Sequence, residues 1–340
     1  MKILHINTFD KGGAAKACIR LHNGLLRCGI DSTLLIREIT SRENIEHLHT
    51  FTSPQKKLLA ERIYSKLKRI NGTRYHEQMK KSIRSHIPDG IEYFSFTDSG
   101  LDITKHPAYQ EADIINLHWV ADFVDYSFFK KNTKPVVWTI HDMNPFTGGC
   151  HYSGGCTNYL NDCTHCPILN VCEDDSYSNY IYKQKCKYIT QKSKLSIVSP
   201  SQWLMKKSEQ SPLLRAFPHH CIPNGFNSLV FLLHDKMRAR QALHLPFDKK
   251  IILFVSDSFS TKRKGYQILI NAMEILKHED VLLCSVGSKD NPTDNHIPIK
   301  EFGHIQSDEK MSLIYSAADL FVIPSVEDNL PNTEIGRAHV

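Results

Sequence analysis

Short apolar runs that end in polar residues recur along this chain of 340 residues. The first run, residues 2–7, is followed by a glycine turn, a stretch of helical spacing and a second apolar run at residues 32–36. A strand, a helix and a strand in this order form a βαβ unit, which requires a parallel sheet. The pattern returns at residues 113–119, 135–142 and 195–201. The sequence therefore predicts an α/β fold in which the polar ends of parallel strands line a crevice.

A second series of strands and helices begins after the turn signal Asn224-Gly225. A chain of this length exceeds one ordinary hydrophobic core, so two domains are expected. We place the boundary near Asn227, with an N-terminal domain at residues 1–227 and a C-terminal domain at residues 228–333. Within the second domain, the patterns predict strands at residues 251–256, 281–287 and 319–324, and helices at 266–276 and 311–318.

The composition is typical of a water-soluble globular protein, with 41% hydrophobic and 23% charged residues. The sequence contains no run of about 18 apolar residues that would span a membrane. Its apolar start at residues 2–7 is too short for a signal peptide. These features predict a cytoplasmic location.

Much of the net charge of +6 comes from the segment 56–84, where lysines and arginines far outnumber Glu61 and Glu77. Apolar residues recur at helical spacing beside these basic side chains. We interpret the segment either as a solvated helix face or as a patch that contacts anionic lipids at the inner face of the plasma membrane. A nucleic-acid partner is not expected, because no nucleic-acid-binding motif accompanies the patch.

Cysteines are frequent for a cytoplasmic chain, and five of the ten lie within the loop 148–172, the last of them Cys172. Four of these, Cys150, Cys156, Cys163 and Cys166, include a C-x2-C pair and suit a closed tetrahedral zinc site. An iron–sulfur cluster, a disulfide pair and free thiols are the alternatives. The others, Cys18, Cys28, Cys186, Cys221 and Cys284, lie in or beside apolar segments and are predicted to be core residues.

Several short motifs share their order and spacing with a known enzyme family. They are Gly12-Gly13-Ala14, residues 116–119 (NLHW), 138–167, 199–204 (SPSQWL), Pro223-Asn224-Gly225, 263–266 (RKGY) and 324–333 (PSVEDNLPNT). Together they resemble the family-4 glycosyltransferases of bacterial surface polysaccharide synthesis, including the colanic-acid type. The resemblance implies a GT-B fold, in which two doubly wound Rossmann-like domains face each other across a cleft. It also implies a retaining transfer from a nucleotide-diphosphate sugar.

The resemblance assigns donor binding to Gly12, Gly13, Arg263, Lys264, Glu327, Asp328 and Asn329. The two glycines would let the backbone approach the donor phosphates closely. Lys264 and Arg263 would neutralise the diphosphate beside a helix N-terminus. Glu327 would hold the donor sugar, and Asp328 can share or take that role. The family usually carries an arginine where this chain has Ser256-Asp257-Ser258, so Arg263 is the expected substitute, and the assignment among Lys262, Arg263 and Lys264 stays open.

His141 and Glu327 are the predicted catalytic residues. His141 ends a strand, where parallel-sheet proteins place functional groups, and by resemblance it faces the reacting sugar. Asp142 beside it is expected to fix the tautomer of the ring. His118 ends another strand. It can bind the substrate as His141 would, or it can be a structural histidine that packs beside Trp119, and we expect both roles equally. The activation barrier of sugar transfer would be lowered by electrostatic stabilisation of the leaving diphosphate and by positioning of the acceptor hydroxyl. No catalytic divalent metal is expected.

The family pattern continues with a second glutamate on the next helix. In this chain the last residues, 334–340 (EIGRAHV), match a translated sequencing adapter instead. We therefore expect a carboxyl-terminally truncated piece with an incomplete second domain. The parent protein would be a hexosyltransferase, and the piece itself is expected to be inactive.

The predicted function is transfer of a sugar to a lipid-linked glycan acceptor in surface polysaccharide synthesis. Two alternatives remain open. One is a catalytically inactive glycan- or nucleotide-binding GT-B protein, which the departure at Ser256-Asp257 supports. The other is a non-hydrolysing sugar-nucleotide epimerase, which shares the two-domain architecture but which the segments 223–225 and 329–333 disfavour.

Overall fold

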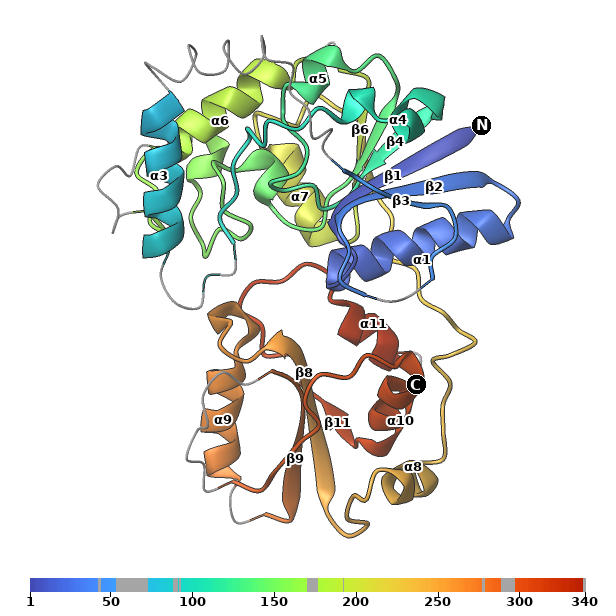
Figure 1. Cartoon of the computed structure of the whole chain (residues 1–340). Helices are drawn as coiled ribbons and strands as arrows, with labels where there is room; N and C mark the ends of the chain where they lie inside the picture. Colours follow the sequence, from blue (N-terminus) through green and yellow to red (C-terminus); the bar gives the residue numbers. More distant parts are fainter. Residues whose placement is uncertain are drawn as a thin grey trace. The chain divides into compact units, whose positions relative to one another are not determined.

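The computed structural model describes residues 1–41, 44–52, 73–87, 91, 93–169, 177–191, 193–276, 279–288 and 297–338. The chain divides into two compact units, each described here by itself (Figure 1). Residues 1–88 and 93–223 belong to the first unit, and residues 224–340 belong to the second.

The first unit is built on a seven-stranded sheet in the order β3-β2-β1-β4-β5-β6-β7, and every neighbouring pair is parallel. The strands are β1 (Lys2–Phe9), β2 (Asp31–Glu38), β3 (Leu48–Thr50), β4 (Ile114–Leu117), β5 (Val136–Thr139), β6 (Leu195–Ser199) and β7 (His219–Cys221). The order reverses between β1 and β4. This reversal is the topological switch point of a doubly wound sheet.

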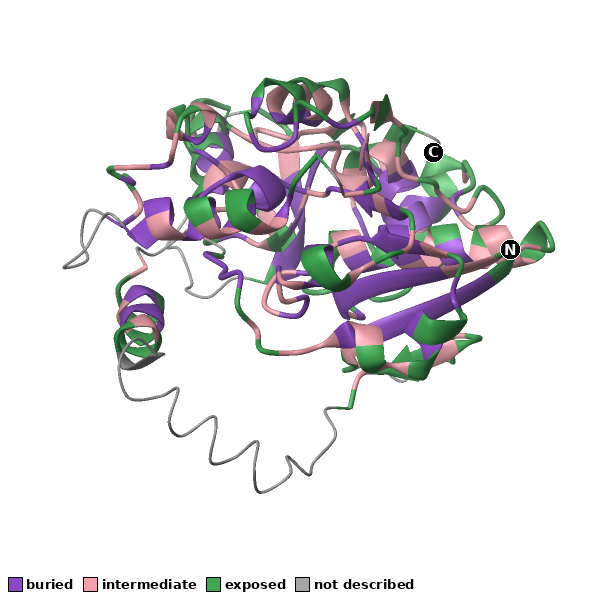
Figure 2. Cartoon of the chain, turned by 90° about the horizontal axis from the view of Figure 1, so that it is seen from above, coloured by how far each residue is buried: buried purple, intermediate pink, exposed green. Residues whose placement is uncertain are grey.

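Helices surround this sheet and leave its central strands largely buried, as the purple strands of Figure 2 show, whereas the edge strands β3 and β7 are more exposed. They are α1 (Gly13–Arg27), α3 (Thr73–His86), α4 (Pro107–Glu111), α5 (Phe128–Lys131), α6 (Tyr177–Tyr188) and α7 (Gln202–Gln210), with 3-10 turns η1 (Ile103–Lys105), η2 (Asn144–Phe146) and η3 (Asn158–Leu160). Trp138 on β5 is 1% exposed and lies in a core with Leu4, Ile6 and Leu117. Ser201 caps α7, because its Oγ accepts the Leu204 N–H.

The second unit carries a parallel four-stranded sheet in the order β10-β9-β8-β11. Its strands are β8 (Lys250–Ser258), β9 (Val281–Ser288), β10 (Ile299–Glu301) and β11 (Leu320–Phe321). Its helices are α8 (Lys236–Ala242), α9 (Tyr266–Ile275), α10 (Asp308–Ala317) and α11 (Asn332–Ala338), with the 3-10 turn η4 (Lys262–Lys264). The predicted strand at 319–324 is thus longer than β11.

Alternation along β8 explains why helices cover both faces of the second sheet. Ile252 and Phe254 pack with α9 in one hydrophobic cluster. Ile251 and Leu253 point to the other face and pack with α8 and α10 in a second cluster. Figure 1 shows α9 on one side of β8 and α10 on the other. A continuous apolar strand of this kind is typical of a parallel sheet that is buried on both faces.

The described part of the basic segment differs from a purely solvated helix face. Residues 53–72 lie outside the described residues, so the predicted lipid-contacting patch is described only from α3 onward. On α3, Met79 and Ile83 are buried, and the Lys80 ammonium donates to Asp98 at 2.7 Å. Among the described helices, none combines the length and apolarity needed to cross a membrane.

Candidate functional site

The switch point of the second sheet brings two predicted donor-binding segments together. β8 and β11 are neighbours there, and each is followed by a loop at its carboxyl end. The loop after β8 contains η4, and the loop after β11 contains the motif 324–329. Ligands of doubly wound sheets bind outside the carboxyl ends of the strands at this point. Topology alone therefore marks this edge as a candidate binding site.

One carboxylate joins the two loops. Asp328 Oδ2 accepts from the Lys264 ammonium at 2.6 Å, and Asp328 Oδ1 accepts from Arg263 Nη1 at 3.1 Å. The backbone pairs as well, because the Val326 N–H donates to the Arg263 carbonyl at 2.8 Å. The three charged side chains are 12–21% exposed, with Asp328 the most buried. The cations are therefore held at the strand ends rather than extended into solvent.

Glu327 and Asn329 flank this carboxylate. The Glu327 carbonyl accepts from Arg263 Nη1 at 3.3 Å, and the Asn329 N–H donates to Asp328 Oδ1 at 3.0 Å. The structure thus brings Arg263, Lys264 and Asp328 into direct contact through their side chains. Glu327 and Asn329 join the same site through their backbones.

Gly265 makes the close approach of the two loops geometrically feasible. Its φ of 74° lies in the left-handed region. A Cβ at this position would lie 2.1 Å from the Pro324 carbonyl oxygen. Only glycine fits both conditions, so η4 can pack directly on the end of β11.

In the first unit, Gly12 and Gly13 occupy the turn between β1 and α1. Gly12 has a φ of 91°, and no atom lies within 4 Å of the position that its Cβ would take. Both glycines are exposed. The N-terminal N–H groups of α1 therefore begin at an open turn beside the switch point, where a helix terminus favours anions.

Three histidines, one on β1 and two just after the ends of β4 and β5, form a hydrogen-bonded chain in the first unit. His5 on β1 contacts His118 through Nδ1 and Nε2 at 3.2 Å, and His118 Nδ1 contacts His141 Nε2 at 3.1 Å. Burial lowers the pKa of His5 to about 3 and that of His141 to about 4. Burial and the two neighbouring rings hold the pKa of His118 well below its ordinary value. The chain is therefore neutral at pH 7.

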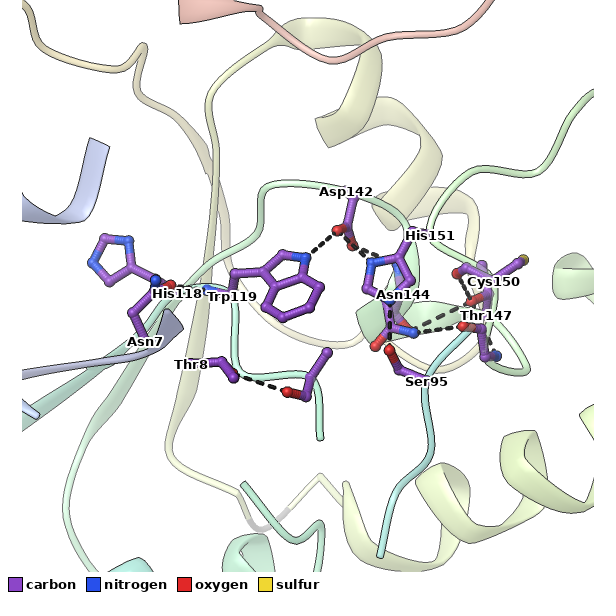
Figure 3. Close-up of polar contacts among 12 residues, drawn as sticks. Asn7, Thr8, Ser95, His118, Trp119, Asp142, Asn144, Thr147, Cys150 and His151 are labelled. Atoms are coloured by element: carbon purple, nitrogen blue, oxygen red, sulfur yellow. Dashed lines mark hydrogen bonds and ion pairs between the residues drawn. The ribbon is translucent and has the colours of Figure 1, made fainter. Parts of the chain in front are cut away.

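The Asp142 carboxylate contacts three groups besides its neighbour His141. Its Oδ2 accepts from Trp119 Nε1 at 2.8 Å and contacts His151 Nδ1 at 2.6 Å, and its Oδ1 accepts from the Asn144 N–H at 2.9 Å (Figure 3). The His141 ring contacts His118. The role of Asp142 in fixing the tautomer of His141 stays a prediction.

Burial raises the pKa of Asp142, but His151, the Asn144 N–H and Trp119 outweigh it and lower the pKa overall. His151 in turn contacts Ser95 Oγ at 2.7 Å through Nε2. This buried network fixes the start of the cysteine-rich loop on the strand ends.

The four predicted zinc ligands line one small cavity. Cys150, Cys156, Cys163 and Cys166 all border it, while Cys172 lies outside the described residues. Of the cysteines that we expected in the core, Cys18 and Cys284 are buried and Cys221 is half-buried. Cys28 and Cys186 are exposed, so the core prediction is wrong for these two. Cys28 follows the last residue of α1, and Cys186 lies on α6.

His5 is a residue of the site region that the sequence patterns did not single out. It lies within an apolar run, where a single histidine carries no periodic signal. A nitrogen of His5, a nitrogen of His118 and the Cys18 sulfur lie within 4.8 Å of one another, and all three residues are buried. Only the parallel register, which sets His5 opposite Asn116 of β4, brings these groups together.

Residues 249–335 match the protein family described as "Glycosyl transferases group 1". Among curated proteins, the chain is similar to a protein of Escherichia coli K12 described as a colanic acid biosynthesis glycosyl transferase, WcaC. The two are 25% identical over 180 residues, which cover 50% of this chain and 40% of that relative. The match thus spans less than half of the relative.

Two solved structures share the fold over nearly the whole chain. The first is Anabaena Alr3699/HepE in complex with UDP and glucose, with a TM-score of 0.57 and 14% identity over 99% of this chain and 78% of that one. The second is WaaG, a glycosyltransferase involved in lipopolysaccharide biosynthesis, with a TM-score of 0.53 and 13% identity over 96% of this chain and 75% of that one. Residues 249–335 therefore resemble the group 1 glycosyl transferases, in a chain with the GT-B fold.

Proposed function

We propose that the protein is a retaining glycosyltransferase that moves a hexose from a nucleotide-diphosphate donor to a surface glycan. The single observation that carries this proposal is the clamp of Arg263 and Lys264 by Asp328 at the switch point of the matched domain. HepE was solved with UDP and glucose, which supports a uridine nucleotide as the first donor to test. WcaC and WaaG support polysaccharide or lipopolysaccharide synthesis as the process.

In this proposal the second unit binds the donor diphosphate. Arg263 offers a planar fork of N–H donors and Lys264 a compact charge, which together suit two linked phosphates. Asp328 keeps both side chains in place before the donor arrives, so less side-chain entropy is lost on binding. Glu327, one residue earlier, would hold the hydroxyls of the donor sugar, and Asn329 would contact the same ligand.

The first unit would supply groups to the phosphates and the reacting sugar. Gly12 and Gly13 would present backbone N–H groups at the start of α1 to the donor phosphates. His141 would meet the sugar as a neutral ring, because its pKa is lowered to about 4. A neutral imidazole donates or accepts one hydrogen bond without adding a charge near the anomeric carbon. The fixed cations of the second unit would carry the charge of the leaving diphosphate.

The proposed acceptor is a lipid-linked glycan at the cytoplasmic face of the plasma membrane. The support is the excess of lysine and arginine in residues 56–84, which would attract anionic head groups. The process named for WcaC also concerns a surface polysaccharide.

Isothermal titration of the whole chain with UDP and UDP-glucose tests the donor site. We expect Lys264→Ala to weaken UDP binding by about 10- to 150-fold, because a hydrogen bond to a charged group contributes about 1.5–3 kcal/mol. Lys310→Ala, an exposed lysine on α10, is the matched control and should leave the affinity unchanged. Equal affinity for UDP in the Lys264→Ala variant and the wild type would refute the assignment of this turn to the diphosphate.

A second measurement separates the alternatives. Incubation with radiolabelled UDP-glucose and a lipid-linked glycan extract should yield labelled glycan if the chain is a transferase. Donor binding without labelled product would support an inactive binding protein. Conversion of the sugar nucleotide to an epimer, with no label in the glycan, would support the epimerase.

A further inference from the structure

We propose that Phe9, Tyr93 and Trp119 form a stacking site for one sugar ring of the acceptor glycan. The three rings meet at Trp119, whose ring centroid lies 5.4 Å from that of Phe9 and 5.4 Å from that of Tyr93. Phe9 ends β1, and Trp119 follows the end of β4. The strand order reverses between these two strands, and ligands of doubly wound sheets bind beyond the strand ends at such a point. The inference rests on the proposed sugar transfer and assigns its acceptor side.

Hydrogen bonds hold Trp119 in one orientation. Its backbone N–H donates to Asn7 Oδ1 at 2.9 Å, and its carbonyl accepts from the Thr8 N–H at 2.8 Å. Its indole Nε1 donates to the buried Asp142 carboxylate at 2.8 Å (Figure 3). The indole cannot turn without leaving that carboxylate short of a donor, which is costly for a buried charge. A ligand would therefore meet a preorganised aromatic surface, and little side-chain entropy would be lost on binding.

Part of this aromatic cluster is open to solvent. Tyr93 is 52% exposed, and Phe9 and Trp119 are half-buried. The face of an aromatic ring carries a partial negative charge, and the axial C–H bonds of a sugar ring carry partial positive charges, so the two surfaces attract each other. The tyrosine hydroxyl can also donate or accept a hydrogen bond at the edge of such a contact. Aromatic rings with a few polar groups are typical of a site for a small ligand.

Two connections place the aromatic cluster beside His141. Trp119 directly follows His118, whose Nδ1 contacts His141 Nε2 at 3.1 Å. Asp142, which binds the indole, directly follows His141. In the proposed function His141 meets the reacting donor sugar, so the acceptor hydroxyl must be positioned near the same ring. The cations proposed for the diphosphate belong to the second unit, so the cluster should contribute to acceptor binding and not to UDP binding.

Steady-state kinetics with radiolabelled UDP-glucose and a lipid-linked glycan extract test the site through the exposed Tyr93. Tyr93→Leu should raise the KM for the extract about 3- to 10-fold, because an alkyl chain replaces the aromatic ring. The kcat and the affinity for UDP should stay unchanged. Tyr93→Phe retains the ring and should keep the KM within about 2-fold of the wild type. Phe247→Leu, which removes a similarly exposed aromatic ring (53%) between α8 and β8, is the matched control and should change nothing.

A binding measurement separates this site from the transfer reaction. Oligosaccharides released from the same extract should change the tryptophan fluorescence of the whole chain in the presence of UDP, and Trp119→Phe should abolish the change.

Glycan binding that Tyr93→Leu weakens, without any transfer by the wild type, would support the site and refute the proposed function. Transfer with an unchanged KM in Tyr93→Leu would overturn the site and leave the proposed function intact. A lower affinity for UDP in Tyr93→Leu, with the KM for the extract unchanged, would overturn the site in favour of stacking on the base of the donor. The absence of both transfer and a fluorescence change would overturn both proposals.

Discussion

Acid should destabilise the first unit far above the pH at which carboxylates titrate. His5, His118 and His141 form a chain in which each contact needs one N–H donor and one acceptor. A proton added to His118, whose two nitrogens both face other rings, turns its acceptor nitrogen into a donor that faces another donor. It also places a charge among buried groups, where Cys18 and His22 provide no negative partner. The neutral chain must therefore break when it is protonated.

The size of the effect follows from linkage. The folded pKa values of about 3 for His5 and about 4 for His141 lie below the ordinary value of 6.5, and that of His118 is lowered well below it. Between pH 6.5 and about 4 the unfolded chain binds protons that the folded chain does not, so stability falls as the pH falls. At pH 5 the unfolded-state pKa of 6.5 lies about 1.5 pH units above the pH, so His5 and His141 each contribute a loss of about 2 kcal/mol. Together they give about 4 kcal/mol, a large part of the stability of a domain, and His118 shifts the stability in the same direction.

Urea unfolding at pH 7, 6 and 5 measures this loss. Tryptophan fluorescence reports on the first unit alone, because Trp119, Trp138 and Trp203 all belong to it. His118→Asn should lower the stability at pH 7 but reduce the loss on acidification, because the pKa of His118 is held well below its ordinary value. His220→Asn, which changes an exposed ring on β7, is the matched control and should change neither value. A wild-type loss below about 2 kcal/mol between pH 7 and 5 would refute the buried neutral chain.

Two further substitutions probe the second unit. Gly265→Ala should destabilise the second unit by about 3 kcal/mol, because alanine disfavours the left-handed conformation and its Cβ would clash with the Pro324 carbonyl. We expect faster amide exchange in α9 and weaker UDP binding. Unchanged amide exchange would contradict the prediction. Asp319→Asn should cost about 2 kcal/mol and remove acid sensitivity below pH 4. Burial raises the pKa of Asp319, but the Ile251 N–H, Lys236 and Arg240 outweigh it and lower the pKa to about 2, so the stability it provides is lost as the pH falls from 3.8 to 2. Amide exchange in β8 at pH 7 and pH 3 measures the effect, with Asp280→Asn as an exposed control; an equal pH response in both variants would count against it.

Much of the fold follows from the sequence because buried parallel strands leave a strong signal. The runs at residues 251–256 and 281–287 became β8 and β9 with small changes at their ends. The run at 319–324 gave only the short strand β11. Backbone hydrogen bonds to β8 extend from the Asp319 N–H to the Val322 N–H, so the predicted run exceeds the paired segment only at Ile323 and Pro324. An apolar run records burial, whereas strand length is set by the hydrogen-bonding neighbour.

The sequence located the site less completely than the fold. Arg263, Lys264 and Asp328 were assigned to one ligand by resemblance, but their direct contact depends on β11 lying beside β8. The histidine chain was not foreseen, because it depends on the register of β1, β4 and β5. Local sequence carries the type of side chain at a strand end. Local sequence does not determine which strands are neighbours in the sheet. The order of the strands decides which of these side chains come into contact.

The clamp at Asp328 explains why this site can be ready for an anion before one is bound. Arg263 and Lys264 are adjacent in sequence and would repel each other if both pointed to the same place in water. One carboxylate, held by the Asn329 N–H and placed at the end of a neighbouring strand, accepts from both and leaves the pair with a net positive charge. In the proposed function, a diphosphate would meet cations that are already oriented, and an oriented charge would stabilise the leaving group without reorganisation during the reaction. The switch point supplies this arrangement, because only there do the loops after β8 and β11 meet.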